Sequence, residues 1–118
     1  MKTNYCILGN NYHIENVENI YDEISALDFN KTELEEVTRL DEDLFQLALN
    51  DGVVVDIGWH PSFEEGGEFI IQVIQNSDWD HPMIKISSGW DKNELIEKLN
   101  IVLGKVRISR SFLPKLTR

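Results

Sequence analysis

The chain has 118 residues and a formal net charge of −10; all five ionisable side chains after Leu103 are basic, so residues 1–103 hold six cations against all 21 acids and carry about −15. The length suits one domain with a hydrophobic core, and a hydrophobic fraction of 42% excludes a disordered acidic chain. The charge excludes nucleic acid and anionic membranes as partners of this acidic body and favours basic protein surfaces.

The N-terminal segment holds a short apolar run, Tyr5 to Leu8, which is followed by Gly9. The single cysteine, Cys6, lies in this run, so we expect a buried thiol and no intrachain disulfide. No stretch has the pattern of a signal peptide or the length of a membrane span, and we therefore expect a cytoplasmic protein.

Apolar residues at helical spacing predict an amphipathic helix over residues 14–27. Its apolar face would hold Ile14, Val17, Ile20, Tyr21, Ile24 and Leu27, while its solvent side would hold acids such as Glu15, Glu18 and Asp22. Residues 31–40 fit either a helical turn or an edge strand. Asp41 fits the N-cap of a second, shorter helix over 42–49, whose early acids suit the positive end of a helix dipole.

Three strands are predicted in the middle of the chain, over residues 53–59, 68–75 and 83–87. Short polar connections rich in turn residues separate them, at 61–67 and 76–82. Two hairpin connections in succession predict an antiparallel meander.

The last regular element is a helix that begins after Asp91. Asp91 and Glu94 have the spacing of a capping box, a stripe of leucine, isoleucine and valine follows, and Gly104 fits the C-terminal cap. The predicted fold is therefore α+β, an antiparallel meander of at least three strands with two or three helices packed on one face. Residues 1–104 would form a single domain, and 105–118 a basic C-terminal extension that is either strand-like or a loose tail.

Carboxylates and histidines gather near the predicted strand ends. Asp56, His60, Asp80 and His81 could hold a metal or act as acid and base in a small metal-dependent enzyme. However, the two histidines are separated by a whole hairpin, and each stands directly before a proline, which suits entry into a turn. No metal-binding or nucleophile motif supports the site, so we expect no catalytic residue, no metal and no cofactor.

The three tryptophans allow two interpretations. Trp59 shares a strand face with valines and isoleucine and is expected in the core. Trp79 and Trp90 lie in turns beside carboxylates, where they could contact arginine or lysine of a partner. Both could equally fold back as lids on the core.

Residues 51–103 have a recognisable order of motifs: Asp56-Ile57-Gly58-Trp59, an acidic glycine-rich hairpin, and Asp78-Trp79-Asp80-His81-Pro82 before a short strand and a final helix. This order resembles small immunity proteins of bacterial contact-dependent growth inhibition and related polymorphic toxin systems. The resemblance implies a cytoplasmic bacterial protein, with no activity of its own, that binds and neutralises a cognate toxin domain, often a nuclease.

The leading hypothesis is therefore an immunity protein, or antitoxin-like inhibitor, whose acidic surface covers a basic toxin. The partner-binding residues expected from the sequence are Glu64, Glu65, Asp78, Trp79 and Asp80. Glu15, Glu18 and Asp22 form a second candidate patch. The alternatives are the small metal-dependent enzyme and a generic protein-binding adaptor with no toxin as partner.

Overall fold

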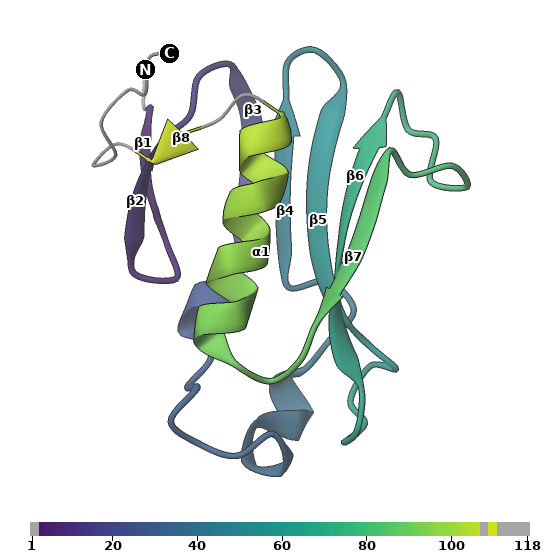
Figure 1. The fold of residues 1–118 in the computed structure, drawn as a ribbon. Coiled ribbons are helices and arrows are strands. Elements are labelled where there is room, and N and C mark those ends of the chain that lie inside the picture. Colours follow the sequence, from purple (N-terminus) through teal and green to yellow (C-terminus); the bar gives the residue numbers. More distant parts are fainter. Residues whose placement is uncertain (1–2, 107–108, 111–118) are drawn as a thin grey trace.

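A computed structural model describes residues 3–106 and 109–110. Its main layer is a five-stranded antiparallel sheet in which each strand pairs with the next along the chain, in the order β3-β4-β5-β6-β7 (Figure 1). The strands are β3 Val17–Asp22, β4 Phe45–Leu49, β5 Val53–His60, β6 Glu68–Gln75 and β7 Ile84–Ser88. Because the sheet is a simple meander, successive connections alternate between its two ends.

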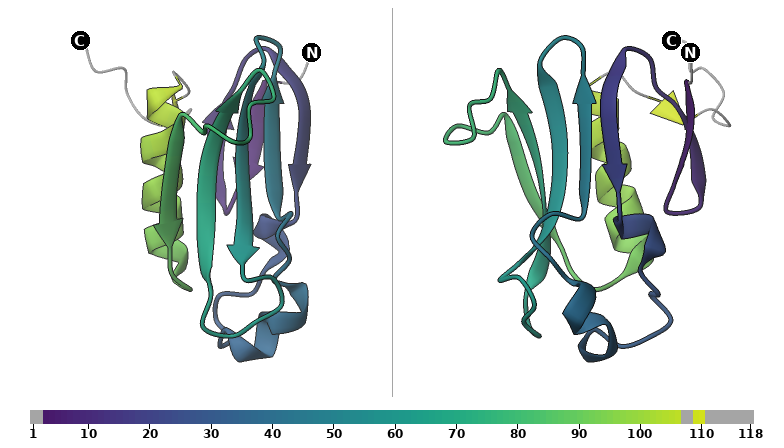
Figure 2. Two further views of the ribbon diagram at one scale, coloured as in Figure 1. Left: turned by 90° about the vertical axis from the view of Figure 1, so that its right-hand side faces the viewer. Right: turned by 180° about the vertical axis from the view of Figure 1, so that it is seen from behind.

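An α-helix covers one face of this sheet (Figure 2). This helix is α1 (Lys92–Lys105), and beside it lies a small sheet of β1 (Asn4–Ile7), β2 (Asn10–His13) and β8 (Ser109–Arg110). The Tyr12 hydroxyl of β2 donates to Asn100 Oδ1 of α1 over 2.7 Å, which joins the small sheet to the helix. The five-stranded sheet therefore has one covered face and one open face.

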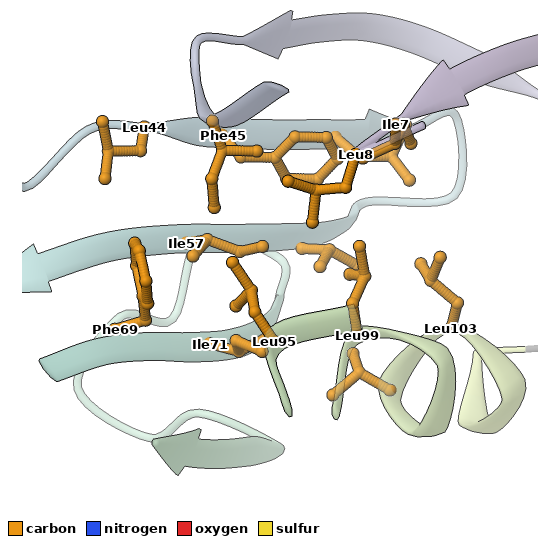
Figure 3. Close-up of a cluster of buried hydrophobic side chains, with 14 of the residues drawn as sticks. Ile7, Leu8, Leu44, Phe45, Ile57, Phe69, Ile71, Leu95, Leu99 and Leu103 are labelled. Carbon is orange, nitrogen blue, oxygen red and sulfur yellow. The ribbon is translucent and has the colours of Figure 1, made fainter. Parts of the chain in front are cut away.

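The core fills the space between α1, the small sheet and the covered face (Figure 3). Leu95, Leu99 and Leu103 of α1 point at the strands, and each is at most 1% exposed. Alternate residues of β5, from Val53 through Val55 and Ile57 to Trp59, are buried on the same face, as the period of a strand requires.

The three predicted central strands and the last helix are confirmed. The capping prediction for α1 is also confirmed, because the Asp91 side chain accepts a hydrogen bond from the Glu94 backbone N–H over 3.1 Å. Glu94 Oε1 in turn accepts from the Gly89 N–H. The helix continues one residue past Gly104, and Val106 is its C-terminal cap.

The predicted helix over 14–27 is wrong, because this segment forms β3 and a short 3-10 turn, η1 (Ile24–Ala26). The cause is an irregularity in the pairing of β3 with β4 between Val17 and Asn19. It puts Val17 opposite Leu49 and Ile20 opposite Leu47, so two residues three apart face the same core. A bulged strand thus reproduces the spacing of a helix.

The predicted short helix over 42–49 is also wrong, because residues 45–49 are β4. Phe45, Leu47 and Leu49 are buried while Gln46 and Ala48 are half-buried, a two-residue period that pairing with β5 imposes on good helix formers. Residues 31–40 contain a 3-10 helix, η2 (Leu34–Arg39), which favours the helical-turn alternative. The two or three packed helices of the predicted fold are therefore not confirmed, since α1 is the one α-helix among the described residues.

Two smaller predictions can also be compared with the structure. Cys6 is exposed rather than buried, because β1 alternates and turns Tyr5 and Ile7 inward instead. Of the predicted extension over 105–118, the described residues are the end of α1, Val106 and β8, whose backbone pairs with β2; the rest lies outside the described residues. No helix in the described part of the chain is long and apolar enough to span a bilayer.

Candidate functional site

The open face of the sheet carries a row of polar side chains that crosses all five strands. The pairing register aligns Tyr21 with Gln46, Gln46 with Asp56, Asp56 with Gln72, and Gln72 with Lys85. Neighbouring members of the row are about 5 Å apart, the spacing between strands. A solvated sheet face is usually polar, but this row contains one residue that is not solvated.

That residue is Asp56, which is 7% exposed although it lies on the open face. Gln46 Nε2 donates to Asp56 Oδ1 over a long 3.4 Å, and none of the ion pairs among the described residues involves Asp56. Burial is the main cause that raises the pKa of Asp56, and the nearby Asp43 charge raises it further, against lowering effects of Gln46 and His60. Asp56 is thus a buried acid with weak compensation.

A groove runs along this part of the open face. It has a volume of about 250 Å³ and is lined by Tyr21, Asp43, Phe45, Gln46 and Asp56; we name it the Tyr21 groove. Tyr21 is 46% exposed and forms one wall, while Asp56 lies two strands away from it. The groove is smaller than a typical small-molecule site of roughly 300–1,000 Å³, and its size suits one side chain.

A second hollow of about 300 Å³ shares Tyr21 and Asp43 with the Tyr21 groove. Its other polar lining includes Glu23, Asp41 and Arg39. Arg39 is already engaged, because its guanidinium donates to buried Glu36 over 2.9 Å and to the Ala26 carbonyl over 2.7 Å. The hollow is therefore acidic.

The residues that line these hollows lie towards the end of the sheet where β3 finishes and β4 begins, and most of the 21 acids fall in the segments at this end. At this end β3, β5 and β7 finish and β4, β6 and α1 begin, and we name residues 23–44, 60–68 and 89–91 the acidic end. Its acids are Glu23, Asp28, Glu33, Glu35, Glu36, Asp41, Glu42, Asp43, Glu64, Glu65, Glu68 and Asp91. Lys31 and Arg39 are its only lysine and arginine.

The connection between β5 and β6, residues 61–67, is fixed by three hydrogen bonds, one from Trp59 of β5 and two with other residues of the acidic end. The Trp59 indole N–H donates to the Glu64 carbonyl over 2.8 Å, and the Phe63 N–H donates to the Leu40 carbonyl over 2.7 Å. The Gly66 N–H donates to the Glu33 carboxylate. Phe63 is 53% exposed with a φ of +59°, a left-handed conformation that is costly for a bulky residue.

The predicted partner-binding residues fall into two groups. Glu64 and Glu65 are exposed in the 61–67 connection, whereas Asp78, Trp79 and Asp80 are exposed in the β6–β7 connection. Strand β6 separates the two groups, and its eight residues span about 26 Å. The structure therefore places Glu64 and Glu65 in the acidic end, whereas the β6–β7 connection, which holds the other three, lies at the opposite end of the sheet (Figure 2).

The alternative metal set is not brought together. Asp56 lies in the middle of β5 and His60 at its end, while Asp80 and His81 lie in the β6–β7 connection. Among residues 3–106 and 109–110, no group of three or more histidine, cysteine or acidic side chains could hold a metal ion. His81 Nδ1 lies 3.1 Å from Asp78 Oδ1, an exposed local pair.

The tryptophans differ in burial. Trp59 is fully buried, as expected, with its ring edge-on to Phe69 at 4.9 Å. Trp90 is a partly exposed lid, because it stacks on Phe29 at 4.5 Å and donates to the Lys31 carbonyl. Trp79 is 46% exposed.

The second candidate patch does not lie on a helix. Glu15 pairs with His13 over 2.8 Å, and Glu18 is exposed on β3. Asp22 accepts from the backbone and hydroxyl of Ser25, so it acts as a local cap. These acids do not form one helical face.

The sequence interpretation missed the roles of Tyr21, Gln46 and Phe63. Local spacing places Tyr21 on an apolar helix face and Gln46 in a helix, so the sequence alone aligns neither of them with Asp56. The alternation of Phe45, Leu47 and Leu49 with Gln46 and Ala48 is the signal that could have identified β4 and hence the polar row.

No family model, no curated protein and no solved structure matches this chain.

Proposed function

We propose that this protein is an inhibitor of the immunity-protein type, which binds a basic protein domain, expected to be a nuclease toxin, through its acidic end. The observation that carries the proposal is the concentration of acids in residues 23–44, 60–68 and 89–91 around two acidic hollows. Nucleases present basic clefts to nucleic acid, and an acidic surface of complementary potential would cover such a cleft.

Apolar anchors support a protein partner at this surface. Tyr21, Leu34 and Phe63 are each 46–57% exposed among the carboxylates. Aromatic anchors surrounded by polar groups are typical of the residues that carry binding energy at protein interfaces. The fixed 61–67 connection would lose little conformational freedom on binding, which favours affinity.

The division of the predicted residues into two groups gives a matched test. The test needs a candidate toxin domain, sought first among the genes beside the one for this chain and produced as a catalytically inactive variant for kinetic binding measurements. Glu64→Lys with Glu65→Lys should weaken binding at least about tenfold, which is about 1.4 kcal/mol. Asp78→Lys with Asp80→Lys changes the net charge equally and should weaken binding less than about threefold.

The same variants can be tested in cells that produce the active toxin domain. The wild-type chain and the Asp78/Asp80 variant should restore growth, and the Glu64/Glu65 variant should protect less. Absence of binding by the wild-type chain would refute the proposal, and binding without protection would favour an adaptor. Loss of binding only in the Asp78/Asp80 variant would move the contact surface to the opposite end.

A further inference from the structure

We propose that the Tyr21 groove is a binding site for the guanidinium group of an arginine side chain, with Asp56 as its principal ligand. The inference deepens the proposed function, on which it rests for the source of the arginine: a side chain that the basic partner inserts into the open sheet face. The polar row and the Tyr21 groove define the geometry of this proposed site.

The carboxylate of Asp56 is buried, but few partners compensate for its loss of water. Asp56 is 7% exposed, the one hydrogen bond of its side chain among the described residues is the 3.4 Å contact from Gln46, and its Oδ2 accepts none there. A buried carboxylate normally has a cation or several donors as partners, because its desolvation is costly. Lys85 lies in the same row, but Gln72 stands between it and Asp56. The compensation that Asp56 lacks is what an arriving cation would supply.

The shape of the Tyr21 groove also suits a single cationic side chain. Tyr21 and Asp56 stand on strands β3 and β5, about 10 Å apart across β4, and Gln46 lies between them. A cation within about 6 Å of the Tyr21 ring could also reach a carboxylate oxygen of Asp56 at about 2.8 Å. The groove of about 250 Å³ has room for one side chain.

The aromatic wall and the carboxylates of the groove favour arginine over lysine. A guanidinium is planar, so it can stack on the Tyr21 ring while its N–H groups point at Asp56 and at Asp43 on the rim. An ammonium is a compact and strongly hydrated charge that gains less from an aromatic wall. The second hollow next to the groove adds Glu23 and Asp41 to the negative potential that would attract the side chain.

The test uses N-acetyl-arginine amide, whose guanidinium is its only charge, titrated into the isotope-labelled protein while amide chemical shifts are followed. We expect a saturable change, in the millimolar range, confined to the amides around Tyr21, Gln46 and Asp56. N-acetyl-citrulline amide has nearly the same shape without the charge and should cause no saturable change. N-acetyl-lysine amide should bind at least threefold more weakly than the arginine compound.

Asp56→Asn should weaken binding of the arginine compound at least fivefold, whereas Asp80→Asn, a matched loss of one charge at the opposite end, should leave it unchanged. Tyr21→Ala should weaken it about threefold. Shifts spread over all acidic surfaces, equal effects of Asp56→Asn and Asp80→Asn, or equal binding of the lysine compound would each overturn the proposal. Binding of the toxin domain with no saturable response to the arginine compound would refute this site and leave the proposed function intact.

Discussion

At the scale of single residues, Asp56 is the residue at which the stability of the folded protein conflicts most clearly with the proposed binding site. Burial raises the pKa of Asp56 in the folded protein, so the folded state binds a proton more readily than the unfolded state. The ionised form is therefore destabilising at neutral pH, and this penalty disappears as the pH falls through the folded pKa towards the unfolded value. Groups that oppose folding in this way are often retained for binding.

This sign gives a stability prediction for Asp56→Asn, which removes the charge and keeps an acceptor for Gln46. The variant should melt at a higher temperature than the wild type at pH 7, and the difference should shrink as the pH approaches 4. Thermal unfolding followed by circular dichroism at several pH values measures it. A variant that melts lower at pH 7 would show that the Asp56 carboxylate has a compensating partner.

A second prediction at this scale concerns Gly58. A Cβ atom on Gly58 would clash with the Glu42 carbonyl, because the backbone of Glu42 lies directly against Gly58. Gly58→Ala should therefore cost about 2 kcal/mol or more in the free energy of unfolding. Gly104→Ala is the matched control: apart from the adjoining backbone of α1 itself, no atom lies within 4 Å of its Cβ, and inside α1 alanine should stabilise by about 0.5–1 kcal/mol. Urea unfolding of both variants distinguishes a local clash from a general effect of the substitution.

At the scale of elements, the 61–67 connection is held by the side chain of a core residue. Trp59 lies in the core, yet its indole N–H donates to the Glu64 carbonyl and so positions the neighbouring acids. Gly67 permits this approach, since a Cβ there would lie 2.7 Å from the indole nitrogen. The arrangement couples the core directly to the surface that we propose for binding.

Trp59→Phe removes this donor and keeps an aromatic ring in the core. We expect faster hydrogen exchange at the amides of residues 63–66, and weaker binding of the proposed toxin partner. Trp90→Phe is the control, because it removes a similar bond to the Lys31 carbonyl and should increase exchange near residue 31 instead. Equal exchange at residues 63–66 in both variants would contradict the role of Trp59.

The elements also show why part of the fold could be predicted and part could not. Strands β5 and β6 and helix α1 follow from local patterns, namely apolar runs and a capping pair, that agree with their tertiary surroundings. The bulged β3 and the helix-forming sequence of β4 depend on pairing with residues far along the chain, and local spacing contradicts it. The polar row could not be predicted without β3 and β4, so Asp56 was noticed but its partners were not.

At the scale of the whole molecule, the meander determines which connections, and therefore which charged residues, lie at each end of the sheet. Because alternate connections share an end, acids that are distant in the sequence, such as Glu33 and Glu65, lie in one region. A concentrated field of this kind accelerates association with an oppositely charged partner, and salt screens it.

The rate constant for association with the proposed toxin partner should therefore fall at least about tenfold between 10 mM and 500 mM salt, while the dissociation rate constant changes much less. Stopped-flow measurements separate the two rate constants. An association rate that does not depend on salt would exclude electrostatic steering by the acidic end, even if the complex is tight.

The hydrogen bond between Tyr12 and Asn100 joins positions 88 residues apart, and the leucines of α1 seal the core from the same side. During synthesis the N-terminal hairpin and the inner face of the meander therefore emerge from the ribosome without the element that covers them. The sheet stays unsealed until the chain has been made through α1, so a nascent chain that stops before residue 92 should aggregate or be degraded.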